Sequence, residues 1–254
     1  MGAKGLALAT LCVRTICGLI LFFYCFRMCD FDLKFDTKYI KQLLKIGYPI
    51  AIAMILEFFG FNIVTIIMSR VSSLYAAAQS ILITITSATF MVPLAISNAM
   101  AIKVGYSNGA KNYLDIKKYS VAGCTFAVGF MSICAMLFLL FPRQIISLFT
   151  IDENLIKVCI PVVMMSSIYQ IFDGLQVSFS GILKGLKKTL FVTIAIVFGY
   201  WVVGIPLGYL LAFKFNFNLL GFWIGLAISI FTMCVVMGMF IRHLLNKLKK
   251  EYAN

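Results

Sequence analysis

Seven stretches of the sequence run for about 20 residues or more with few charges, long enough to cross a bilayer, and this pattern sets the strongest limit on the fold. They lie at residues 5–26, 46–68, 74–102, 119–141, 158–183, 189–213 and 219–241. Lipid offers the backbone no hydrogen-bond partner, and the stretches lack the alternation of β-barrel strands, so each is expected to be an α-helix. The sequence therefore predicts an all-α, polytopic membrane protein with about seven transmembrane helices.

The composition excludes a single soluble domain. Hydrophobic residues make up 62% of the chain, and the mean hydropathy is +1.01. Soluble domains contain roughly 45–50% apolar and about 25% charged residues, whereas only 12% of this chain is charged. So much apolar surface cannot be buried in one soluble core, and a lipid bilayer is the expected surrounding.

The net charge of +13 raises the question of nucleic-acid binding, but the placement of the cations favours a membrane topology. Alternate loops and the C-terminal tail hold sixteen cations: Arg27, Lys34, Lys38, Lys41, Lys45, Lys103, Lys111, Lys117, Lys118, Lys184, Lys187, Lys188, Arg242, Lys247, Lys249 and Lys250. The opposite loops hold five: Lys4, Arg70, Arg143, Lys157 and Lys214. By the positive-inside rule the cation-rich side is cytoplasmic. This predicts a multi-pass protein of the plasma (inner) membrane, with a cytoplasmic C-terminus and no nucleic-acid partner.

The charge pattern also divides the chain. Residues 1–29 form a separate first span, and residues 30–45 mix aspartates with lysines and aromatics, as expected of a connector along the cytoplasmic surface. Residues 46–245 hold six spans with short loops, and residues 246–254 form a basic cytoplasmic tail. The topology puts the N-terminus outside, and Arg14 interrupts the first apolar run, so we expect no cleavable signal. A chain that begins in this way is expected to lack an N-terminal part.

Two of the nine acidic residues, Glu57 and Asp173, lie near the middle of predicted spans. A carboxylate at the bilayer centre costs roughly 2.5–3.5 kcal/mol on insertion scales, so such acids usually face a protein-lined cavity and serve ions or protons. Glu57 and Asp173 are therefore candidate ligands for Na⁺ or H⁺. The alternative is that each is a neutral acid, hydrogen-bonded to a neighbouring helix.

Other polar residues recur near Asp173 at helical spacing. Tyr169, Asp173, Gln176 and Ser180 are separated by four, three and four residues, which puts them on one face of a helix. This arrangement predicts a polar stripe within an apolar span.

Polar residues also accompany the other acid. Asn62 lies five residues beyond Glu57, and the third span is unusually polar between Gln79 and Asn98. Such a helix suits a wet cavity, although each side chain alone could join two helices by a hydrogen bond. The candidate cavity-lining residues are Asn62, Gln79, Asn98, Gln176 and Ser180. Phenylalanines around Glu57 would favour small organic cations through cation–π attraction.

Motifs of enzymes and metal sites are absent from the sequence. It contains neither H-E-x-x-H nor G-x-S-x-G, and its one histidine, His243, lies in the basic tail. The eight cysteines have no C-x-x-C spacing, and we interpret them as small apolar residues. We therefore expect no enzyme, no cofactor and no metal beyond Na⁺ at Glu57 and Asp173.

Seven segments have the order and spacing of a known family. They are GYP at 47–49, ILEFF around Glu57, AAQ at 77–79, MVPLAISNAMAIKVGYSNG at 91–109, SIYQIFDGLQVSFSGILKG at 167–185, YWVVGIPLGYLLAF at 200–213 and GFWIGL at 221–226. On these segments the chain resembles the C-terminal lobe of the multidrug and toxic compound extrusion (MATE) family, in particular its NorM-like bacterial branch. Two departures are Lys184, where arginine is common, and Lys188, where an acid often stands.

The resemblance implies a site and a function. Members of the family are twelve-helix antiporters of two six-helix lobes, which export cationic drugs in exchange for Na⁺ or H⁺. Glu57, Tyr169 and Asp173 correspond to the family's coupling-cation site. Residues 46–245 would then be the six-helix C-terminal lobe, and residues 1–29 the last helix of an otherwise missing N-terminal lobe.

Several functional hypotheses follow from the resemblance. The first is the C-terminal half of a secondary active transporter that exports cationic drugs or toxic organic compounds by Na⁺- or H⁺-coupled antiport, together with an N-terminal lobe or a second chain. The second is a non-transporting membrane subunit, or half of a split transporter. The third is a lipid-linked sugar flippase, whose cavity would be expected to carry cations for anionic headgroups, whereas the charges within these spans are acidic.

Overall fold

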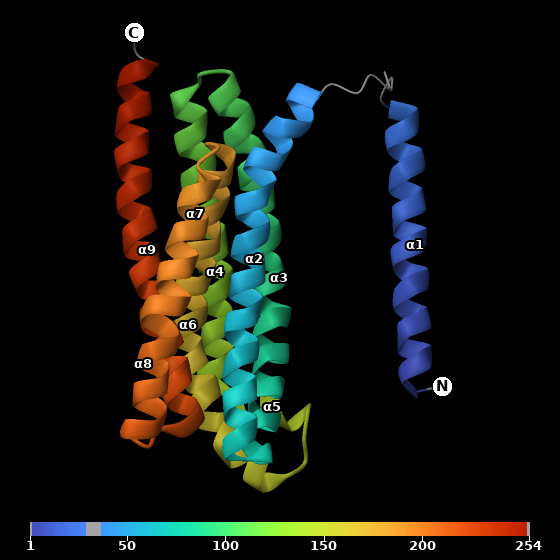
Figure 1. Ribbon diagram of the computed structural model, residues 1–254, viewed down its shortest axis with the longest axis vertical. Helices are drawn as coiled ribbons and strands as arrows, with labels where there is room; N and C mark the ends of the chain where they lie inside the picture. Colours follow the sequence, from blue (N-terminus) through green and yellow to red (C-terminus); the bar gives the residue numbers. More distant parts are fainter. Residues whose placement is uncertain (1, 29–36, 253–254) are drawn as a thin grey trace. The chain divides into compact units, whose positions relative to one another are not determined.

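The computed structural model describes residues 2–28 and 37–252, and nearly all of them are helical (Figure 1). No strand occurs within these two ranges. The chain divides into two compact units, Met1–Leu43 and Leu44–Asn254. The all-α prediction is confirmed for the described part of the chain.

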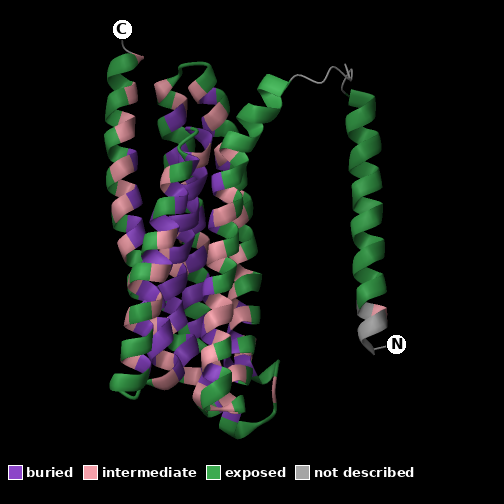
Figure 2. Cartoon of the chain, in the orientation of Figure 1, coloured by how far each residue is buried: buried purple, intermediate pink, exposed green. Residues whose placement is uncertain are grey.

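The first unit contains α1, Gly2–Met28. The apolar window of this helix has no buried residue, and Leu11, Phe22 and Phe23 are among its exposed side chains (Figure 2). A helix that is apolar on all sides requires lipid or other helices around it. That residues 1–29 are the last helix of an N-terminal lobe stays a prediction.

The second unit is a bundle of long helices joined by short connections (Figure 1). Its elements, with α2 counted from Leu44 onward, are α2 (Thr37–Val71), α3 (Ser73–Gly109), α4 (Tyr113–Leu140), α5 (Pro142–Ser147), α6 (Glu153–Gly185), α7 (Thr189–Ile196), η1 (Val197–Gly204), α8 (Ile205–Tyr209), η2 (Leu210–Lys214) and α9 (Asn218–Glu251). Counting Thr189–Lys214 as one, the described residues form seven helices that are long and apolar enough to cross a membrane. The number of spans was predicted correctly.

The helices extend beyond the predicted spans. The expected loop 103–118 shrinks to residues 110–112, because α3 continues to Gly109 and α4 begins at Tyr113. The C-terminal tail is helical up to Glu251, and the predicted connector is helical from Thr37, while residues 30–36 lie outside the described residues. Counting apolar residues finds only the part of a helix that crosses the hydrocarbon core, since polar ends can continue the same helix into water.

Close approach of small residues holds the bundle together around α6, which packs against α3, α4 and α9. A Cβ atom placed on Gly181 would lie only 2.5 Å from the carbonyl oxygen of Ser97. The Ser97 hydroxyl donates to the carbonyl oxygen of Val177 at 2.7 Å. Between α8 and α9, a Cβ on Gly225 would lie 2.5 Å from the amide nitrogen of Gly208. In lipid, such contacts supply the packing and hydrogen bonding that drive helices together.

The sixth span departs from regular α-helix. It passes from α7 into the π-helical segment η1 and, after α8, into a second π-helical segment, η2. Pro206 near the start of α8 has no amide hydrogen to donate to the preceding turn, which explains an interruption of the regular ladder at this point. The wider π turns of η1 carry Tyr200 and Trp201 toward α2.

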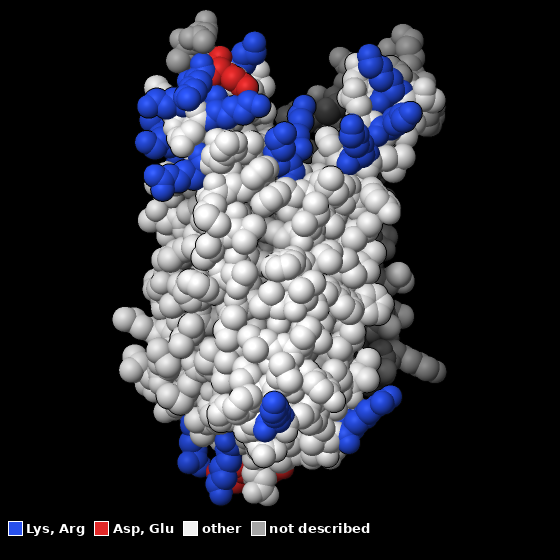
Figure 3. Space-filling model, turned by 60° about the vertical axis from the view of Figure 1, so that its left-hand side comes forward, with Lys and Arg blue, Asp and Glu red and all other residues white. Residues whose placement is uncertain are grey.

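On the face shown in Figure 3, cationic side chains gather at the two ends, with a belt free of them between. Lys103, Lys184 and Lys249 share one end, because α3, α6 and α9 finish where α4 starts. Arg70 and Lys214 lie at the ends of helices that run the opposite way. This agrees with the alternation of charge along the sequence. The assignment of the cation-rich end to the cytoplasm stays a prediction.

Candidate cation-binding site

A cavity of about 330 Å³ opens between α2, α3 and α6. Both acids of the predicted spans line it, together with aromatic, hydroxyl and amide side chains. Its lining consists of Met54, Glu57, Phe58, Phe61 and Asn62 from α2, Ile83, Thr86, Ser87 and Phe90 from α3, and Tyr169 and Asp173 from α6. The three residues predicted as the coupling-cation site, Glu57, Tyr169 and Asp173, therefore share one cavity.

Glu57 is held by contacts between α2 and η1. The Tyr200 hydroxyl donates to Oε1 of Glu57 at 3.5 Å, and the indole Nε1 of Trp201 donates to the carbonyl oxygen of Leu56 at 3.3 Å. Nearer the start of α2, the Thr193 hydroxyl donates to the carbonyl oxygen of Pro49 at 2.7 Å. The backbone of α6 packs closely against those of α3, α4 and α9, whereas the backbone of α2 stands farther from them. Side chains bridge the wider gap by hydrogen bonds, so α2 is held in place while space for a cavity remains beside it.

Asp173 lies opposite, on α6, and only 6% of it is exposed. Both Asp173 and Glu57 belong to the lining of the same cavity. Two carboxylates that face one cavity repel each other, and a bound cation or a proton relieves this repulsion. The pair is therefore suited to take up one positive charge from solution.

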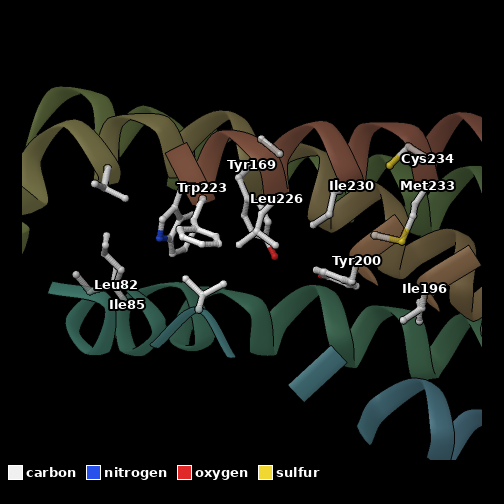
Figure 4. Packing of buried hydrophobic residues seen from close by; sticks show 14 of the residues in the cluster. Leu82, Ile85, Tyr169, Ile196, Tyr200, Trp223, Leu226, Ile230, Met233 and Cys234 are labelled. Atoms are coloured by element: carbon white, nitrogen blue, oxygen red, sulfur yellow. The ribbon is translucent and has the colours of Figure 1, made fainter. Parts of the chain in front are cut away.

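Tyr169 is buried and packed between rings on both sides. Its ring lies 5.3 Å from that of Trp223 and 6.4 Å from that of Phe61, both nearly edge-to-face. Figure 4 shows Tyr169 beside Trp223 in a row of buried side chains that continues to Tyr200. The Trp223 indole donates to Oε1 of Gln79 at 2.9 Å, so the row is fixed at one end by a buried hydrogen bond. Aromatic packing of this kind leaves Tyr169 little freedom to turn.

The candidate lining residues have different positions. Asn62 lines the cavity and donates to the carbonyl oxygen of its own helix at Phe58, at 2.8 Å. The others are not part of the lining: Gln79, Gln176 and Ser180 are buried, and Asn98 is exposed farther along α3. A role for these four residues in a cavity stays a prediction.

Tyr200 is the site residue that the sequence did not reveal. Its position in an apolar span beside Trp201 indicated only packing or contact with lipid. The pairing with Glu57 depends on the π-helical turns of η1, which no residue pattern predicts. A tyrosine hydroxyl within an apolar span needs a hydrogen-bond partner, and the presence of Tyr200 in such a span was the one signal that the sequence offered.

The cavity presents oxygen atoms of the kind that bind small cations. Two carboxylates, a phenol and the hydroxyls of Thr86 and Ser87 are the ligand types that hard monovalent and divalent cations prefer. No group of three or more His, Cys, Asp or Glu side chains that could hold a metal occurs in residues 2–28 and 37–252. Beside the acids, the rings of Phe58, Phe61 and Phe90 supply apolar walls with negative faces.

Comparison with known proteins gives one matching family model, described as MatE, which covers residues 49–210. Among curated relatives, the probable multidrug resistance protein NorM of Bacillus subtilis (strain 168) is 33% identical over 220 residues, covering 87% of this chain and 48% of the relative. The protein of the same description from Mesorhizobium japonicum is 34% identical over 197 residues, covering 76% and 42%. The chain thus spans about half the length of the curated relatives it matches.

Solved structures give the same fold. A crystal structure of MATE in the bent conformation matches with a TM-score of 0.84 at 19% identity, over 98% of this chain and 56% of the other. The outward-facing conformation of a multidrug resistance MATE family transporter of the MOP superfamily matches with a TM-score of 0.80 at 17% identity, over 86% and 49%. At these identities the likeness concerns the fold, and the matched part of this chain corresponds to about half of each structure.

Proposed function

The chain belongs to the MATE family, and from this we propose that it is the C-terminal half of a cation-coupled antiporter that exports organic cations. Glu57, Tyr169 and Asp173 bind the coupling cation. The proposal depends mainly on one observation, the placement of Glu57 and Asp173 on the same cavity although they come from α2 and α6.

Competition for this cavity accounts for exchange. When Na⁺ or H⁺ occupies the two carboxylates, their repulsion is relieved and the cavity has no further demand for positive charge. When the small cation leaves, an organic cation can take its place, held by the acids and by the rings of Phe58, Phe61 and Phe90. Each species excludes the other, because both bind the same pair of negative charges.

A transport cycle requires a second wall for the substrate. The cavity opens on the bundle surface between α2 and α3, and the chain spans about half of its curated relatives. We infer that an N-terminal lobe, on the same polypeptide or on a separate one, completes the cleft. Drug export is accordingly a property of the assembled pair, whereas cation binding belongs to this half.

Binding by the purified chain tests the proposal without the other half. We expect tetraphenylphosphonium to bind in detergent, and Na⁺ or a lowered pH to displace it. Glu57→Gln and Asp173→Asn should each weaken binding by at least about tenfold, the loss typical of removing one partner of a desolvated charge pair. Asp115→Asn removes an acid at the start of α4, away from the cavity, and should leave binding unchanged. Unchanged binding in the Glu57→Gln, Asp173→Asn double variant would refute the assignment.

Export is tested in cells that produce the chain together with the N-terminal half of a close homologue. Ethidium accumulation should fall in these cells and recover in the Glu57→Gln variant. Imposed Na⁺ and pH gradients, applied separately to membrane vesicles, identify the coupling ion. Binding without export in the paired system would support the alternative of a non-transporting subunit.

A further inference from the structure

A second hollow in the bundle lies between α3 and α4. It has a volume of about 420 Å³ and is lined by α3 between Val92 and Lys103 and by α4 between Tyr119 and Phe130. Lys103 is the only charged residue in this lining. It shares no residue with the cavity around Glu57 and Asp173, so the site proposed above does not account for it.

The hollow is elongated along the helices. Its α3 wall runs from Val92 to Lys103 and its α4 wall from Tyr119 to Phe130, eleven residue steps each. At 1.5 Å per residue both walls are about 16 Å long. This is close to half of a hydrocarbon core about 30 Å thick, which is the depth of one leaflet.

Small residues on both walls produce the hollow. Ala99 on α3 and Ala122 on α4 leave space between the two helices. Gly123 lies beneath them, where the side chain of Met100 occupies the position that a Cβ would need, with its sulfur 1.9 Å from that point. The packing of Met100 on Gly123 therefore closes the floor of this hollow, which is a groove between α3 and α4 that is open to the surface along its length.

Lys103 and Tyr119 mark the interfacial end. The Lys103 ammonium lies 5.9 Å from the centre of the Tyr119 ring, at the cation-rich end of the bundle. No ion pair of Lys103 with an acid occurs in the part of the chain that the structure describes. Lysine and tyrosine at this depth are the side chains that meet phosphate headgroups.

The rim of the groove is suited to lipid. Phe126 is 72% exposed, and Val92 and Tyr119 are also exposed. The neighbouring exposed face of α3 carries Ser87 and Asn98, which suit water or a polar partner better than acyl chains. The groove thus has an apolar rim, the length of one leaflet and a single cation at the membrane interface. These three features fit a phospholipid with an anionic headgroup.

We propose that this α3–α4 groove binds one anionic phospholipid, with an acyl chain between Val92 and Phe130 and the phosphate on Lys103. The lipid fills a gap that the side chains leave and adds an anion to a surface with few acids. Lipid composition then affects the stability of the α3–α4 pair, and through α3 the wall of the cation cavity.

Photo-crosslinking in proteoliposomes tests the site. The chain is reconstituted in phosphatidylcholine vesicles with a trace of phosphatidylglycerol that carries a diazirine in one acyl chain, and crosslinked peptides are mapped by mass spectrometry. We expect labels within residues 92–103 and 119–130. Lys103→Gln should lower this labelling about fivefold, as expected for one lysine near the membrane surface. Lys117→Gln, which removes an exposed cation outside the groove at the same end, is the matched control.

A second pair of variants separates a specific groove from general contact with lipid. Ala122→Phe fills the groove and should remove the label, while Val121→Phe, on the exposed face of α4, should retain it. Helical content and elution profile establish that each variant folds. Label spread evenly over all helices, or no label within residues 92–103 and 119–130, would overturn the proposal. This outcome is independent of tetraphenylphosphonium binding, so either proposal can fail without the other.

Discussion

Tyr200 connects the cation cavity to a helix that does not line it. Its hydroxyl reaches Glu57 from η1, and the residue itself is fully buried. The hydrogen bond restricts the carboxylate to one side of the cavity. If Glu57 binds a cation as proposed, we expect this binding to depend on a residue that lies outside the cavity wall.

Replacing Tyr200 with phenylalanine tests this dependence. A net hydrogen bond contributes about 0.5–1.5 kcal/mol, so Tyr200→Phe should weaken binding of the coupling cation by about threefold to tenfold. The measurement is the Na⁺ or pH dependence of tryptophan fluorescence, since Trp201 is adjacent. Tyr209→Phe, half-exposed in the same span, is the control. Equal affinities in the two variants would show that the 3.5 Å contact has no energetic role.

A second prediction concerns the buried bond between Trp223 and Gln79. Trp223→Phe removes the donor and leaves Oε1 of Gln79 without its partner in a fully buried position. Hydrogen bonds between membrane helices contribute about 0.6 kcal/mol on average and up to about 1.7. We therefore expect the free energy of unfolding to fall by an amount in this range, and Tyr169 to be packed less tightly. Thermal unfolding in detergent measures the loss of stability. An unchanged unfolding temperature would contradict the prediction.

At the scale of elements, the close packing of α6 against α3 depends on the absence of a Cβ atom at Gly181. The Cβ of alanine at position 181 would lie 2.5 Å from the backbone of Ser97, and backbone cannot yield as a flexible side chain can. Gly181→Ala should therefore push α6 from α3 and cost about 1–3 kcal/mol of stability. Gly129→Ala is the matched control, because nothing lies within 4 Å of a Cβ there. We expect the Gly181→Ala variant to unfold at a lower temperature than the Gly129→Ala variant. Equal unfolding temperatures would mean that α3 and α6 can move apart without loss of stability.

The helices could be predicted from the sequence, whereas most contacts between the helices could not. Long apolar stretches specify seven helices because lipid permits nothing else, and the midspan positions of Glu57 and Asp173 identify two cavity residues by the cost of burying charge. Charged helix ends escaped prediction, since hydropathy reports only the lipid-crossing part. The π-helical turns and the partner of Tyr200 escaped it as well, because they depend on how one span packs against another.

At the scale of the whole molecule, the distribution of cations predicts orientation. If the positive-inside rule applies, the end with Lys249 faces the cytoplasm and the α5–α6 connection faces outward. Cysteines introduced one at a time into a cysteine-free version provide the test. A membrane-impermeant maleimide should label Ile151→Cys, where the native side chain is 95% exposed, in intact cells. Lys249→Cys should be labelled only after permeabilisation, and the reverse pattern would invert the topology.

The connection between α2 and α3 is a single residue, Ser72, whose amide donates to the carbonyl oxygen of Met68. Two helices joined so tightly cannot slide past each other and can separate only as the arms of a hinge. Glu57 stands fifteen residues from this pivot, an arm of about 22 Å, so a rotation of about 5° widens the gap at Glu57 by about 2 Å. A rotation of α2 away from α3 would widen the cavity between them. If α2 also moved away from η1 by this distance, the 3.5 Å contact from Tyr200 to Glu57 would break, together with the bond from Trp201 to Leu56.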